Sequence, residues 1–145
     1  LFAAVAPVAG TLLTDCTRAV PTSLLQIHGT ADDRVPFDGG PGKAKTIAGA
    51  PNVDGPPVSA VNATWRGIDG CGEPATSTAG AVTTQTADCP GGRTVELISI
   101  AGAGHQWPGG VPSPVAQRLG DLPPPSTALN ATDTIWRFFS GHAKS

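Results

Sequence analysis

A histidine and an aspartate occupy the two loops of this sequence whose residue types are best suited to chemistry. His105 stands in ISIAGAGHQWPGG (98–110), where glycines and a proline follow an apolar run. Asp32 stands in HGTADDRVPF (28–37), which also follows an apolar run. Open α/β sheets form their ligand sites just beyond the carboxyl ends of their strands. We therefore expect both loops to lie at one edge of a sheet, with Asp32 close to His105.

Nucleophilic hydrolysis is the chemistry that such a pair would serve. The acid fixes the imidazole tautomer through one ring nitrogen, and the other ring nitrogen takes the proton from a serine. α/β-Hydrolases carry these residues in the chain order serine, acid, histidine, and Asp32 does precede His105. No G-x-S-x-G motif occurs in the 145 residues. The expected nucleophile would then lie upstream of Leu1, and we expect the sequence to be a fragment or a processed product.

Length and charge exclude several other classes of function. The chain has 145 residues, which suffice for one domain, and we treat residues 1–145 as a single partial domain. It carries 9 Lys and Arg against 11 Asp and Glu, without a basic stripe, so nothing favours nucleic acid or an anionic membrane surface. The opening residues 1–10 are too short to span a bilayer and lack the basic flank of a signal peptide.

Three apolar runs, at residues 2–8, 23–28 and 95–100, predict strands. Because these runs do not alternate with polar residues, they favour buried parallel strands. Residues 58–66 predict a short helix, and residues 130–142 predict a longer one that Asn130 caps and Gly141 ends. The predicted fold class is therefore α/β with an open, mostly parallel sheet. We expect Trp65 and Trp136 to pack against its core.

The three cysteines bear on the redox compartment. Cys71 and Cys89 flank a Gly/Thr/Ala segment with little core-forming material, the kind of loop that a disulfide closes in an exported protein. We expect that disulfide, and the alternative is two buried thiols in a reducing compartment. Cys16 is left as a free thiol or pairs outside this sequence. No Cys/His cluster has zinc-binding spacing, so we expect no metal site.

Several motifs together resemble one family of esterases. FAAVAPVAG, IHGTADDRVPFDGG, GCGEP, GAGHQWPGG and IWRFF are similar to the C-terminal half of the poly(3-hydroxybutyrate) depolymerase-like and feruloyl/acetyl-xylan esterase family. The resemblance implies an α/β-hydrolase fold and a secreted or lipoprotein serine esterase. It also implies that Asp32 is the catalytic acid and His105 the catalytic base, with the serine and the oxyanion hole in the first half.

The expected function is thus a secreted carboxylic-ester hydrolase that uses a Ser-His-Asp acyl-enzyme mechanism and needs no cofactor or metal. Its substrate would be a polyester, feruloyl ester or acetyl ester, and this chain alone would be inactive. The alternative is a non-catalytic, secreted, disulfide-stapled binding module.

Three residues near the expected site have roles that the sequence leaves open or assigns to structure. Trp107 either lines the acyl pocket or packs beneath its loop. Asp33 either caps a turn or replaces Asp32 as the acid. His28 is expected to be structural, bonded to nearby backbone.

Overall fold

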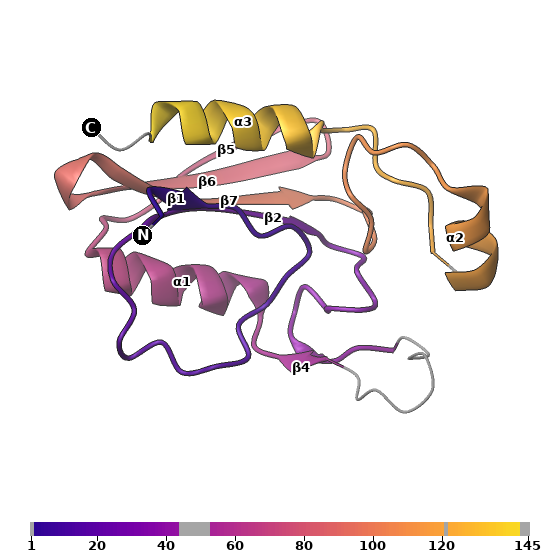
Figure 1. Ribbon diagram of the computed structural model, residues 1–145, viewed down its shortest axis with the longest axis horizontal. Helices are drawn as coiled ribbons and strands as arrows, with labels where there is room; N and C mark the ends of the chain where they lie inside the picture. The colour runs from indigo at the N-terminus through magenta and orange to yellow at the C-terminus, as the bar shows by residue number, and fades with distance from the viewer. Residues whose placement is uncertain (1, 44–52, 121, 143–145) are drawn as a thin grey trace.

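A five-stranded mixed sheet forms the centre of the computed structural model, which describes residues 2–43, 53–120 and 122–142 (Figure 1). In spatial order its strands are β1 (Ala4–Val5), β2 (Ser23–Gly29), β7 (Arg93–Ile100), β6 (Val82–Cys89) and β5 (Ala75–Ala79). β1, β2 and β7 run parallel, whereas β6 and β5 are antiparallel to their neighbours. A separate antiparallel pair is formed by β3 (Gly40–Pro41) and β4 (Asp54–Gly55).

Helices cover both faces of the sheet, as Figure 1 shows. α1 (Val58–Asp69) lies on one face and α3 (Ala131–Gly141) on the other, while α2 (Pro114–Gly120) lies off the end of the sheet. A single 3-10 turn, Pro90–Gly92, connects β6 to β7. The α/β class is therefore confirmed. No helix in the described ranges is long and apolar enough to cross a membrane.

The expectation of a mostly parallel sheet is wrong, because the segment between the two cysteines forms a β-hairpin. The antiparallel ladders of β5, β6 and β7 join more residue pairs than the parallel ladders do. β5 is exposed along its whole length and β6 is mostly half-buried. Because most of their residues stay outside the core, neither strand has the apolar run by which the other strands of this sheet were predicted. Their threonines are β-branched and suit such a half-exposed sheet surface. Gly80 has a positive φ of 59° and begins the two-residue turn that joins them.

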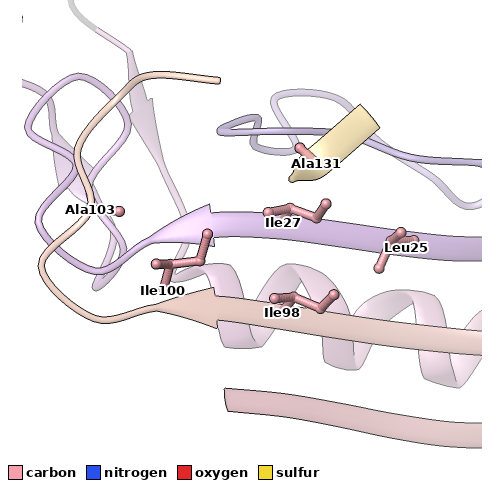
Figure 2. Close-up of a cluster of buried hydrophobic side chains, with 6 residues drawn as sticks. All are labelled: Leu25, Ile27, Ile98, Ile100, Ala103 and Ala131. Atoms are coloured by element: carbon pink, nitrogen blue, oxygen red, sulfur yellow. The ribbon is translucent and has the colours of Figure 1, made fainter. Parts of the chain in front are cut away.

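β2 forms the core because both of its faces are covered. All seven of its residues are buried. Leu25 and Ile27 point toward α3 and pack with Ile98, Ile100 and Ala131, as Figure 2 shows. Leu24 packs on the α1 side with Val95 and Trp65. This two-sided burial explains why the sequence of β2 is continuously apolar rather than alternating.

The predicted strands 23–28 and 95–100 are present, but the predicted strand 2–8 is shorter. It consists of β1 and one isolated bridge from Val8 to Ile27. Around this bridge the Ile27 N–H donates to the Pro7 carbonyl, and the Ala9 N–H donates to the Ile27 carbonyl. Pro7 has no N–H of its own to donate to β2, so the ladder is interrupted between β1 and the bridge.

Both predicted helices are present. α1 continues to Asp69 and ends where Gly70 takes the left-handed conformation. Asn130 caps α3 as predicted, since its side chain accepts a hydrogen bond from the Asp133 N–H at 3.1 Å. Trp65 is half-buried against the core as expected, but Trp136 is 71% exposed and that prediction is wrong. Ile135 and Phe138 face the sheet instead, and Trp136 lies on the other side of the helix.

The predicted disulfide between Cys71 and Cys89 is present. Cys71 follows the end of α1 and Cys89 ends β6, so the bond links the helix to the sheet at the base of the β5–β6 hairpin. Both cysteines pack against Leu24 and Val95. Cys16 is a free thiol.

Candidate active site

The loops that follow β2 and β7 are joined by backbone hydrogen bonds. The two strands are parallel neighbours, so their carboxyl ends lie side by side. The N–H of Thr30 donates to the carbonyl of Ile100 at 3.0 Å, and the N–H of Ala31 donates to the carbonyl of Ala103 at 2.9 Å. These bonds hold the loop that carries Asp32 against the loop that carries His105.

Two glycines make this close approach possible. A Cβ atom on Gly29 would overlap the carbonyl group of Ala103, so no side chain fits there. Gly102 has a φ of 72°, and its N–H donates to the Thr30 hydroxyl at 2.9 Å. Figure 2 shows Ala103 in the loop just beyond Ile100. Gly29 and Gly102 therefore allow the backbones of the two loops to lie in contact.

Asp32 is buried, with 5% of its surface exposed, and both of its carboxylate oxygens are occupied. Oδ1 accepts hydrogen bonds from the N–H groups of Arg34 at 2.8 Å and Val35 at 2.9 Å. Oδ2 faces two histidine rings, those of His105 and His28. A buried carboxylate requires such partners, and this one has a defined orientation because of them.

His105 meets Asp32 in the arrangement expected of a catalytic acid–base pair. Its Nδ1 lies 2.9 Å from Oδ2 of Asp32. Because an ionised carboxylate only accepts hydrogen bonds, Nδ1 carries the proton and Nε2 presents a lone pair. The His105 side chain is 37% exposed, and no side chain in the described part of the chain is hydrogen-bonded to Nε2. That nitrogen is free to act on a group brought to the surface.

The electrostatics favour an ionised Asp32. Burial by itself raises the pKa of this carboxyl group, because it penalises the charged form. Hydrogen bonds from His105, from His28 and from the Val35 and Arg34 N–H groups act in the opposite direction and outweigh it. The pKa of Asp32 therefore lies well below its ordinary value.

The geometry distinguishes Asp32 from its neighbour Asp33. The Asp33 side chain is 55% exposed, and its Oδ1 lies 3.6 Å from Nε of Arg34. Its backbone carbonyl accepts a hydrogen bond from the Lys43 N–H at 2.7 Å. Of the two aspartates, Asp32 is the one that His105 contacts.

His28 is a neighbour of the pair that the sequence did not reveal. Its Nε2 lies 2.8 Å from the carbonyl oxygen of Val35, which agrees with the expected backbone bond. The same nitrogen lies 3.3 Å from Oδ2 of Asp32, a contact that was not expected. The i, i+4 spacing of His28 and Asp32 across a tight turn was the only available signal.

Trp107 is two residues beyond His105 and is 47% exposed. Its indole N–H donates to the hydroxyl of Thr132 in the first turn of α3 at 3.1 Å. The N–H of Gly110 closes a turn onto the Trp107 carbonyl at 2.9 Å. The polar edge of the ring is thus fixed to the helix, while part of the residue's surface remains accessible to solvent.

Within residues 2–43, 53–120 and 122–142, no group of three His, Cys, Asp or Glu side chains is placed to hold a metal ion. Comparisons with known proteins give no family model and no curated protein that matches the chain.

Proposed function

We propose that this chain supplies the acid and the base of a secreted carboxylic-ester hydrolase of the α/β-hydrolase type, with its serine in a segment that precedes Leu1. The observation that carries the proposal is the 2.9 Å contact from Nδ1 of His105 to Oδ2 of buried Asp32, with the His105 ring partly exposed. The two residues lie 73 positions apart and come from loops at the carboxyl ends of adjacent parallel strands. This is where α/β-hydrolases place their acid and histidine.

Each residue has a defined part in the proposed reaction. Nε2 of His105 takes the proton of the serine hydroxyl while the serine oxygen attacks the ester carbonyl. The resulting imidazolium is stabilised by Asp32, and it then protonates the departing alcohol. A water molecule, deprotonated by His105 in the same way, then attacks the acyl-enzyme, and the carboxylic acid product is released. The lowered pKa of Asp32 supports this assignment, because the residue must stay ionised throughout.

The edge of the sheet at β1 supports the proposal that the first half of the domain lies in the upstream segment. β1 is an edge strand and pairs only with β2 in the described part of the chain. In an α/β-hydrolase, a further parallel strand would pair with this edge and end in the serine turn. The resemblance in the sequence motifs favours polyester, feruloyl or acetyl esters as substrates. We assign Trp107 a place beside the acyl group, because it follows His105 by two residues on the same loop and is 47% exposed.

Secretion, including export as a cell-envelope lipoprotein, is part of the same proposal. The Cys71–Cys89 disulfide supports it, since such bonds persist in oxidising compartments.

The decisive experiment adds the upstream segment to the chain, either in the full-length protein or as a separate polypeptide. Hydrolysis of p-nitrophenyl butyrate, methyl ferulate and a short 3-hydroxybutyrate oligomer is then measured. We expect activity that a serine-directed phosphonate blocks and that His105→Ala abolishes, whereas the 145-residue chain alone is inactive.

Two results contradict the proposal. One is a parent reading frame with no G-x-S-x-G ahead of Leu1. The other is binding of esters or their polymers without turnover by the full-length protein, which indicates a non-catalytic binding module.

A further inference from the structure

His28 is buried beside the candidate acid without belonging to the Asp32–His105 pair. It is the penultimate residue of β2, and its side chain is fully buried. The ring of Phe37 meets it edge-on, with 6.0 Å between ring centroids. A polar ring is costly to bury unless its nitrogen atoms find partners, so the contacts that His28 does make are informative.

The hydrogen bonds of His28 define its tautomer. Nε2 lies 2.8 Å from the Val35 carbonyl oxygen and 3.3 Å from Oδ2 of Asp32. Both oxygens are acceptors, so Nε2 carries a hydrogen and donates to them. Nδ1 is buried and has no partner among the described residues. The neutral ring with its proton on Nε2 is therefore the form that leaves no buried donor unpaired.

The same contacts hold the carboxylate of Asp32 at a second point. Two backbone N–H groups fix Oδ1, but a carboxylate held only at Oδ1 can still pivot about that atom. His28 restrains Oδ2 directly. It also restrains Val35, whose N–H binds Oδ1 of Asp32 and whose carbonyl binds His28.

We infer that His28 is a positioning residue: its Nε2–H, shared between Val35 and Asp32, holds Oδ2 where the Nδ1–H of His105 meets it. The inference rests on the proposed function, because the orientation of His105 matters only if its Nε2 acts as a base. His28 does not touch the reacting atoms and acts through Asp32. A displacement of about 1 Å in such an assembly can lower turnover about a hundredfold.

Three variants separate positioning from simple burial. His28→Leu removes the donor, whereas His28→Gln places a side-chain N–H close to the position of Nε2. Gln26→Leu is the matched control, because Gln26 lies two residues earlier on β2 and is equally buried. Both polar atoms of its side chain lack a hydrogen-bond partner in the described part of the chain, so the change breaks no contact to Asp32.

The first readout is independent of catalysis. Imidazole ¹⁵N shifts of the labelled chain report which nitrogen of each histidine carries the proton. We expect Nε2–H for His28 and Nδ1–H for His105 in the unmodified chain. We expect His28→Leu to lose the single His105 tautomer, and His28→Gln and Gln26→Leu to keep it. An Nδ1–H tautomer of His28 in the unmodified chain overturns the inference even if His28→Leu does not fold.

The second readout is turnover in the protein that contains the serine segment. We expect His28→Leu to lower kcat by about tenfold to a hundredfold with little change in KM, and His28→Gln to restore part of the loss. A folded His28→Leu variant with unchanged kcat and unchanged His105 tautomer refutes the role of His28. Absence of hydrolysis by the unmodified protein refutes the proposed function instead, while the ¹⁵N shifts still decide the role of His28.

Discussion

Gly29 packs against the carbonyl group of Ala103, with no room for a side chain between the two residues. Gly29 ends β2, and Ala103 lies in the loop that follows β7. Their contact brings together two loops that are far apart in the sequence, one carrying Asp32 and the other His105. The acid–histidine pair therefore depends on a backbone contact that involves neither of its members.

Replacing Gly29 with alanine should separate the two loops. We expect Gly29→Ala to lower the free energy of unfolding by about 1–3 kcal/mol, because the new methyl group must displace the Ala103 carbonyl. Urea denaturation measures this loss. The control is Gly67→Ala in α1, where an added Cβ meets no atom within 4 Å and should raise stability by about 0.5–1 kcal/mol. Equal effects of the two substitutions would show that the contact is unimportant.

Replacing Asp32 with asparagine should remove the acceptor that orients His105. In the protein that contains the serine segment, we expect Asp32→Asn to lower kcat by about 10⁴-fold, because the imidazole adopts the wrong tautomer. KM should change little. Asp33→Asn is the matched control and should be mild, since the Asp33 side chain is largely exposed and does not contact His105. If Asp33→Asn proves the more damaging, the acid has been misassigned.

The parts of the fold that could be predicted from the sequence are those whose structure follows from a few neighbouring residues. The core strand β2 has a continuous apolar run because both of its faces are covered, and Asn130 caps α3 by a purely local hydrogen bond. The pairing of Asp32 with His105 was predictable for a related reason. Both loops begin where such a run ends, and parallel neighbouring strands end at the same edge.

The features that were missed depend on contacts that the sequence pattern does not record. The β5–β6 hairpin has little buried apolar surface, and its threonines and Gly80 resemble a loop. Trp136 was expected to pack against the core, but the direction of its side chain is set by which face of α3 meets the sheet. His28 and Asp32 are four residues apart and come together only because the chain turns after β2. An i, i+4 spacing indicates a contact within a helix, but it does not indicate one across such a turn.

Acid should weaken the protein partly through Asp32. Its pKa is lowered in the folded state, so as the pH falls the unfolded chain, whose aspartates titrate near about 3.9, takes up this proton first. The stabilisation from the ionised carboxylate is therefore complete above that pH and declines as the pH falls toward the folded pKa. In urea titrations, we expect the difference in the free energy of unfolding between the unmodified chain and Asp32→Asn to shrink as the pH falls from about 5 to about 3. Parallel curves for the two proteins would contradict this expectation.

Loss of the Cys71–Cys89 disulfide should destabilise the chain more than loss of the free thiol. The bond closes a segment with a sequence separation of 18 that contains the whole β5–β6 hairpin. Closing a loop of this size stabilises a fold by about 3 kcal/mol in the chain-entropy model. We expect the double variant Cys71→Ser with Cys89→Ser to lose stability of this order in urea denaturation, and Cys16→Ser, which breaks no disulfide, to lose far less. Peptide mapping without reductant should recover the two cysteines in one linked pair. Alkylation of both thiols in the native, unreduced protein would show that the bond does not form.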